Sequence, residues 1–196
     1  FEADDGGMRS NGSWAWGTPT YPDTLEAQSG VNVWATNLDG DYESNAADWL
    51  LLPCNVNLAA LDNPVVGSVG WFDIELDWDF AYQVVDHDGD GVFDIMAEWT
   101  GSSEGWHWGY GIFSEEHAAS ENAGVGMLLI SDATVTAAGL YLDDIFISSG
   151  PAMEVSTEAM ADTVMPGESS GHPFVIENTG GLPFSYDVMA SSVGDG

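Results

Sequence analysis

The chain has almost no positive charge. It contains no lysine and one arginine, Arg9, against 33 aspartate and glutamate residues, which gives a formal net charge of -32. Nucleic acids bind proteins through lysine and arginine side chains that neutralise phosphates, and anionic membranes attract the same side chains. We therefore expect no nucleic-acid partner and no membrane partner. Because the acidic residues lack basic partners, salt or bound cations must screen their repulsion, as in a saline or a calcium-rich extracellular medium.

Cysteine and long apolar runs are also scarce. Cys54 is the single cysteine, which excludes a disulfide-stabilised domain, and its position after the apolar residues 50–52 predicts that it is buried. No apolar run approaches the ~20 residues of a membrane-spanning helix, and no signal peptide is visible. Because the chain opens directly in strand-like sequence, we expect a mature or excised part of a longer, secreted protein, without membrane insertion.

Helical periodicity is almost absent, and strand signals dominate. Short runs rich in Val, Ile, Trp, Tyr and Phe are separated by Gly, Asn, Asp and Pro, which is typical of an all-β, two-sheet jelly-roll sandwich. Apolar residues make up 44% of the chain, enough for a sizeable core. The expected strands are Ser13–Trp16, Asn32–Thr36, Asp48–Leu52, Gly67–Asp77, Phe80–Val85, Phe93–Thr100, Trp106–Phe113, Gly124–Ser131 and Gly139–Ser148.

Within one expected strand, acidic and apolar residues alternate over positions 71–78. The alternation predicts that Asp73, Glu75 and Asp77 share a wet face while the apolar residues face the core. The segments Thr20–Gly30 and Ser114–Asn122 lack strand patterning. We expect two loops there, the second with a helical turn.

A domain boundary is expected near positions 148–151. Residues 1–149 then form the jelly roll, and residues 150–196 form a partial β unit that resembles the start of an immunoglobulin-like module through the Asn-Thr-Gly phrase at 178–180. This unit is too short for a seven-stranded sandwich, so either a longer chain or a neighbouring molecule completes it. Its expected strands are Met153–Thr157, Gly171–Asn178 and Phe184–Met189.

The first 148 residues resemble a known family. Phe-Glu at 1–2, Trp-Ala-Trp-Gly-Thr-Pro at 14–19 and the segment 30–42 resemble the MAM-like jelly-roll modules of secreted bacterial proteins. The segment 139–147, with an acidic pair before an isoleucine, is similar to the closing strand of these modules. The resemblance implies that the first and last strands lie side by side.

The same resemblance implies a cation site at the junction of the two ends of the module. There Glu2 would meet the acidic pair Asp143 and Asp144, so that these three residues become candidate calcium ligands. The alternative is that one of the two aspartates simply faces water at the end of a strand. We expect the cation by a small margin.

The strongest chemical signal is the segment 86–94. Its acidic residues occupy positions one, three, five and nine of an EF-hand-like calcium loop, and its glycine occupies position six. Ala97 at position twelve leaves that loop incomplete, and strands rather than helices flank it. Because clustered carboxylates repel unless a cation lies among them, Ca2+ is favoured over a solvated acidic turn. The candidate ligands are Asp86, Asp88, Asp90 and Asp94.

The nine tryptophans divide between core and a possible ligand surface. One strand face carries Trp106, Trp108 and Tyr110, which would form a stacking platform for sugar rings if that face were exposed. The interior of the sandwich is the favoured interpretation. The alternating strands predict four core tryptophans, namely Trp14, Trp16, Trp34 and Trp71.

The sequence shows no catalytic signature. Its four histidines are scattered, and Gly-x-Ser-x-Gly and His-Glu-x-x-His are missing, so we expect no enzyme. A glycosidase would draw its two carboxylates from Asp73, Glu75 and Asp77. The sequence favours a non-catalytic extracellular cell-surface module for adhesion or for binding a glycan or protein ligand, stabilised by Ca2+. Two alternatives stay open: a self-assembling filament or sheath subunit, a homopolymer completed by strand addition, and an accessory domain of a secreted peptidase or glycosidase.

Overall fold

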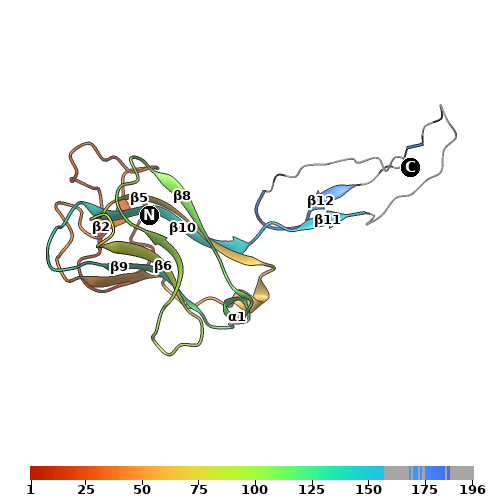
Figure 1. Ribbon diagram of the computed structural model, residues 1–196, viewed down its shortest axis with the longest axis horizontal. Helices are drawn as coiled ribbons and strands as arrows, with labels where there is room; N and C mark the ends of the chain where they lie inside the picture. Colours follow the sequence, from red (N-terminus) through yellow and green to blue (C-terminus); the bar gives the residue numbers. More distant parts are fainter. Residues whose placement is uncertain (157–167, 169, 172, 174, 184, 186–196) are drawn as a thin grey trace, which may run out of the picture.

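Two antiparallel five-stranded sheets form the body of the protein (Figure 1). The computed structural model describes residues 1–156, 168, 170–171, 173, 175–183 and 185. The first sheet has the order β1-β4-β9-β6-β7 and the second the order β2-β3-β10-β5-β8. The first contains β1 (Arg9–Ser10), β4 (Ala47–Leu51), β9 (Gly124–Ile130), β6 (Phe80–Asp86) and β7 (Asp94–Trp99). The second contains β2 (Ala15–Gly17), β3 (Val33–Ala35), β10 (Gly139–Ser149), β5 (Pro64–Asp73) and β8 (His107–Ile112).

The core lies between the two sheets, as alternating apolar residues of a sandwich require. One cluster joins Leu50 and Leu129 of the first sheet to Trp34 and Leu140 of the second. A second cluster, which includes Val66 of β5 and Val125 of β9, fills the other end of the space between the sheets. The predicted all-β, two-sheet sandwich is therefore confirmed.

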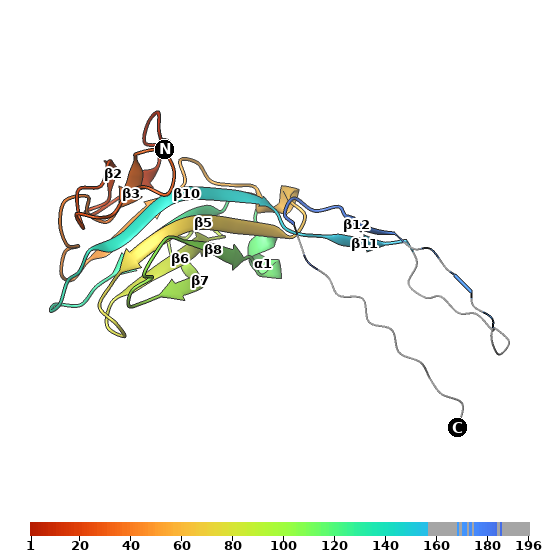
Figure 2. The ribbon, with the colours of Figure 1, turned by 90° about the horizontal axis from the view of Figure 1, so that it is seen from above.

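The long strands β5 and β10 form the backbone of the second sheet. They pair from Gly139 opposite Asp73 to Ser149 opposite Pro64, and Figure 2 shows them side by side along the length of the sandwich. The register shifts between Leu142 and Ile145. An irregularity of this kind re-aims the side chains at that point, here those of the intervening acidic pair.

Part of the outer face of the second sheet is also covered. Tyr141 and Trp71 contact each other edge to face there, with ring centroids 5.4 Å apart. Tyr21 and Leu38, from the long segment before and after β3, pack over them. The structure therefore has a third apolar layer over one half of this sheet.

Several expectations about local structure are wrong. The strand expected to reach Asp77 ends at Asp73, because a turn begins at Glu75, whose carbonyl accepts the N–H of Asp79. Leu76 and Trp78 are consequently exposed, and the predicted core face does not form beyond Ile74.

The expectations for the ends of the sandwich and for the cysteine are also wrong. Strand β1 pairs with β4 in the first sheet, whereas β10 lies between β3 and β5 in the second, so the first and last strands are not side by side. Cys54 is exposed. Of the four predicted core tryptophans, Trp14 and Trp34 are buried between the sheets, Trp16 packs against the same cluster, and Trp71 lies in the outer layer.

Helical structure is confined to short pieces. The 3-10 turn η1 spans Leu58–Ala60, and the helix α1 spans Glu115–Ala118 within the segment where a helical turn was expected. Ser114 caps α1 by accepting the N–H of His117. Within the described part of the chain, no helix is long and apolar enough to cross a membrane.

Beyond the sandwich, β11 (Met153–Val155) and β12 (Ile176–Asn178) form a two-stranded antiparallel sheet. Figure 1 shows this hairpin projecting from the end of β10. These strands fall within two of the three expected strands. The third, Phe184–Met189, lies outside the described residues apart from Ser185. The division at residue 149 and the immunoglobulin-like assignment therefore stay predictions.

The contact between β4 and β9 gives a test of this packing. A methyl group at Gly126 of β9 would overlap the carbonyl oxygen of Leu50, which is backbone and cannot turn away. We expect Gly126→Ala to lower the free energy of unfolding by about 1–3 kcal/mol or more in urea denaturation. Gly105→Ala is the control, since nothing lies near its Cβ, and it should change stability by less than about 0.5 kcal/mol. Equal stability of the two variants would contradict the packing described here.

Candidate functional site

Strand β8 presents aromatic rings on the outer face of the second sheet. Trp108 and Tyr110 are 57% and 52% exposed, and the alternate positions, Gly109 and Gly111, face inward. A side chain at Gly111 would overlap the amide of Gln83 in the opposite sheet. The close approach of the sheets therefore puts glycine on the inner face of β8, and the large side chains stand outward.

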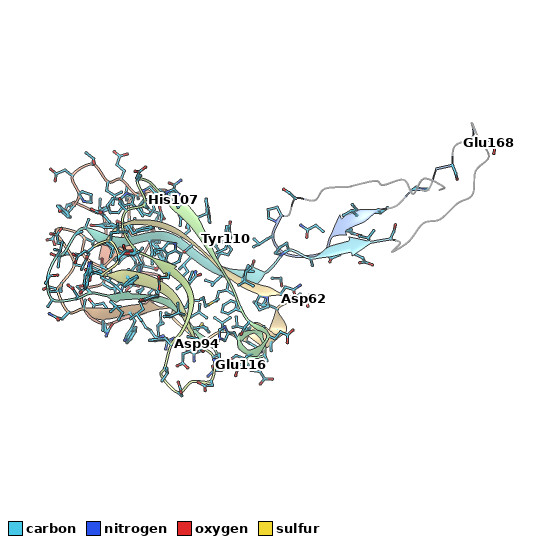
Figure 3. The ribbon with its side chains drawn as sticks, viewed as in Figure 1. Asp62, Asp94, His107, Tyr110, Glu116 and Glu168 are labelled. Carbon is cyan, nitrogen blue, oxygen red and sulfur yellow. The ribbon has the colours of Figure 1, made fainter. Side chains whose placement is uncertain are left out.

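The two exposed rings belong to a three-residue aromatic surface, Trp108, Tyr110 and Phe146. The planes of Trp108 and Tyr110 are within 14° of parallel, with centroids 6.3 Å apart. The ring of Phe146 contacts both edge to face and lies over Gly67, where a methyl group would overlap it. Figure 3 labels Tyr110 on this strand. The surface is thus fixed by ring contacts and by a glycine beneath it.

The favoured interpretation of this face as interior is wrong for Trp108 and Tyr110. Alternation identified the shared face but could not show that the outer layer stops short of them. Trp106, in contrast, is part of the outer layer. Its indole N–H donates to the carbonyl of Glu26 at 2.9 Å, and its ring packs with the apolar residues of that layer. The structure therefore joins two of the three predicted ligand residues and adds Phe146.

A groove of about 310 Å³ continues the aromatic surface toward the second unit. Apolar residues dominate its lining, which consists of Val65, Tyr110, Ile112, Pro151, Leu182 and Pro183. Ile112 is 79% exposed beside it. Exposed apolar area of this kind, contiguous with aromatic rings, is typical of an interaction surface.

The hairpin between β6 and β7 carries the acidic loop. Asp86, Asp88 and Asp90 each offer a carboxylate oxygen within 4.8 Å of the others. Backbone N–H groups shape the loop: Asp86 accepts from Gly89 at 2.8 Å and from Gly91 at 3.2 Å. The structure therefore brings three of the predicted ligands together, and calcium at this loop stays a prediction.

The fourth predicted ligand, Asp94, is not part of that group. Its carboxylate lies 2.8 Å from Nδ1 of His87 and 3.4 Å from Nε2 of His117. The hydrogen bond that His87 donates to the Asp94 carboxylate raises the pKa of His87 above its ordinary value. Sequence spacing placed Asp94 at loop position nine, but the chain turns into β7 there and the side chain points to the histidines instead.

The carboxylates of Glu2 and Asp143 both accept hydrogen bonds from the segment 29–32. Glu2 accepts the N–H groups of Val31 at 2.8 Å and Asn32 at 3.1 Å, and these bonds lower the pKa of its carboxyl. Asp143 is buried and accepts the N–H of Ser29 at 2.6 Å, while burial raises its pKa.

Asp144, the second member of the acidic pair, is exposed. Among the described residues, Glu2, Asp143 and Asp144 do not form a group of three converging oxygens. A cation at this junction stays a prediction.

A further carboxylate cluster was missed by sequence reasoning. Glu75, Asp79 and Asp132 offer oxygens within 4.8 Å of one another, from the turn after β5, the start of β6 and the end of β9. Asp79 is fully buried and accepts the hydroxyl of Tyr42 at 2.5 Å and the N–H of Asp132 at 2.7 Å. One oxygen of Glu75 is buried without a hydrogen-bond partner. Glu75 and Asp79 are neighbours in sequence, but Asp132 lies 53 residues beyond Asp79, so no local pattern predicts the group of three.

The chain matches no family model. It is 30% identical over 165 residues to Bacillopeptidase F of Bacillus subtilis strain 168, in an alignment that covers 78% of this chain and 10% of that protein. The chain therefore spans about a tenth of the length of this curated relative.

Two solved structures also match a large part of the chain. The K2 cleaved adhesin domain of Lys-gingipain matches with a TM-score of 0.52 and 14% identity, over 74% of this chain and 89% of that chain. TmCBM61 in complex with β-1,4-galactotriose matches with a TM-score of 0.41 and 15% identity, over 73% and 88%. The first of these supports the sandwich fold.

The carboxylate cluster of Glu75, Asp79 and Asp132 predicts that the stability of the fold depends on pH. Burial, followed by the charges of Asp132 and Asp79, raises the pKa of Glu75 above 4.5. The folded state therefore binds this proton more tightly than the unfolded chain, and stability is lost as the pH rises through the folded-state pKa. In chelator at neutral pH, Glu75→Gln should melt at a higher temperature than the wild type.

The difference between the two proteins should vanish toward about pH 4, where the unfolded carboxyl is also protonated. Glu121→Gln removes an exposed charge and is the control. A lower melting temperature of Glu75→Gln in chelator at neutral pH would show that the ionised carboxyl stabilises the fold.

Proposed function

We propose that the chain is a non-catalytic extracellular module that binds a neutral glycan on its aromatic surface. The single observation that carries this proposal is the exposure of Trp108 and Tyr110 as nearly parallel rings. Monomeric proteins leave large contiguous apolar patches uncovered chiefly where they bind something. The surface is rigid before binding, so little conformational entropy is lost on contact.

The chemistry of the rings and the charge of the chain favour a sugar. The flat face of a pyranose presents C–H bonds, whose positive edge complements the negative face of an aromatic ring. A formal charge of -32 repels anionic ligands such as uronic-acid polymers. A protein ligand is the competing occupant, and it would use the apolar groove beside Ile112 more fully.

We infer that this module acts within a larger protein. The similarity to a tenth of Bacillopeptidase F supports an accessory domain that positions a peptidase or another partner domain. The MAM-like assignment and an extracellular location belong to the same proposal, supported by the sandwich fold. The described residues offer no observation that favours the filament alternative.

Calcium stabilisation is the second part of the proposal. The loop oxygens of Asp86, Asp88 and Asp90 converge on the hairpin, which contains no lysine or arginine. Bound Ca2+ would remove their mutual repulsion and hold the β6–β7 turn. Binding to the folded state alone raises stability by mass action.

The glycan proposal is tested by affinity electrophoresis in gels that contain neutral polysaccharides, with polygalacturonate as the anionic comparison. We expect retardation by at least one neutral polysaccharide and none by polygalacturonate. Trp108→Ala should weaken binding at least about tenfold, since central aromatic residues dominate such interfaces. Trp78→Ala is the matched control, because Trp78 is 66% exposed on the distant turn after β5.

Equal retardation of Trp108→Ala and the wild type would contradict the assigned surface. Failure to bind any neutral polysaccharide in the panel would contradict the glycan and leave a protein as the ligand.

The calcium proposal is tested by thermal melting in Ca2+ and in chelator. We expect Ca2+ to raise the wild-type melting temperature by roughly 5 °C or more. The double variant Asp88→Asn, Asp90→Asn should lose this response. The control Asp23→Asn, Glu26→Gln removes the same charge from an exposed loop and should keep it. A response that survives in the first double variant would place the ion elsewhere.

A further inference from the structure

Three side chains from three elements converge beside the acidic loop. His87 lies just after β6, Asp94 begins β7, and His117 is on α1. Nδ1 of His87 and Nε2 of His117 approach the same carboxylate oxygen of Asp94, at 2.8 and 3.4 Å. The two imidazole rings are 5.2 Å apart. Figure 3 shows Asp94 at the end of the sandwich where α1 lies.

The fold fixes the positions of both histidines. The backbone carbonyl of His87 accepts the hydroxyl of Ser120 at 2.5 Å, which ties the hairpin to the segment after α1. The N–H of His117 is bound by the capping residue Ser114 at 3.2 Å. The two imidazoles are therefore brought together by tertiary structure, although they are thirty residues apart in a chain with few histidines.

The spacing of these donor atoms suits a transition-metal ion. Zn2+ lies about 2.0–2.1 Å from imidazole nitrogens and about 2.0–2.2 Å from carboxylate oxygens in tetrahedral sites, so neighbouring ligand atoms are about 3.3 Å apart. Two of the three distances here are 2.8 and 3.4 Å, and the third is within 4.8 Å. Small side-chain shifts would therefore complete three ligand positions.

The second ring nitrogen of each histidine lies in a different environment. The ring of His117 is only 16% exposed, and its Nδ1 is buried without a hydrogen-bond partner, so the polar contact given for this ring is that of Nε2 with Asp94. Nε2 of His87 lies 3.6 Å from the carboxylate of Glu116. Metal-bound histidines commonly have such a carboxylate at the other ring nitrogen, where it fixes the tautomer.

We propose that His87, Asp94 and His117 bind a divalent transition metal ion, with Zn2+ as the best match. Imidazole and carboxylate suit Zn2+, whereas the oxygen-only group of Asp86, Asp88 and Asp90 suits Ca2+. The β6–β7 hairpin supplies all of the second set and two members of the first, His87 and Asp94, but the sets differ in donor type, so each selects a different ion. Water completes the fourth position. This inference is independent of the glycan proposal.

The test is calorimetric titration of the full, chelator-treated chain with Zn2+ in a millimolar excess of Ca2+, which occupies the many carboxylates. We expect one saturable site. His87→Gln and His117→Gln should each weaken it by at least about tenfold, and Glu116→Gln by about 10-fold or more through the orientation of His87. His107→Gln removes a histidine outside the cluster and should bind as the wild type does.

Co2+ gives a second readout, because tetrahedral nitrogen and oxygen ligands produce visible absorption that exposed carboxylates do not. Melting of the metal-free variants checks that each one folds, and the highly exposed Glu116 provides a variant that cannot disturb the core. Equal Zn2+ affinity in the His87, His117 and His107 variants would overturn the proposal. So would the absence of saturable binding in Ca2+, which would leave the imidazoles as charge partners of Asp94.

Discussion

The structure depends on how unpaired negative charge is accommodated. Every ion pair among the described residues involves a histidine, and Arg9 donates to the carbonyl of Leu52 and the amide of Asn55 rather than to a carboxylate. Carboxylates that enter the fold must therefore find N–H or O–H donors or cations. Asp48 shows the first solution, since its carboxylate accepts both the N–H and the hydroxyl of Ser13.

The same constraint explains where the carboxylates gather. Single buried carboxylates, such as Asp143, fasten loops to strands through backbone donors. Groups of three occur in the β6–β7 hairpin, where backbone N–H groups are the donors, and around Glu75, which keeps an unpaired buried oxygen. Without a counterion, the repulsion between the carboxylates of these groups lowers the stability of the fold. The hairpin offers two sets of donor atoms that suit a cation. Electrostatic cost in this fold is thus concentrated at a few places that bound ions can relieve.

The sequence predicted the class of fold because strand periodicity survives in most segments. Segment 71–78 shows the limit: its alternation is regular, but the turn at Glu75 interrupts the strand and sends that carboxylate inward. Loop spacing identified Asp86, Asp88 and Asp90, since they are local, and misassigned Asp94, whose partner His117 comes from a distant helix. Sequence periodicity predicts which face of the sheet a side chain occupies. Whether another layer covers that face depends on tertiary structure.

The aromatic surface and the charged hairpin occupy different parts of the sandwich. Trp108 and Tyr110 stand on the outer face of the second sheet, whereas the hairpin joins β6 to β7 in the first. Glycines on the inner face of β8 let the sheets approach closely, and the same alternation turns the large rings outward. An ion at the hairpin would therefore not touch a molecule on the aromatic surface, because the two places lie on opposite sheets. The strongly acidic chain thus keeps an uncharged aromatic surface apart from this hairpin.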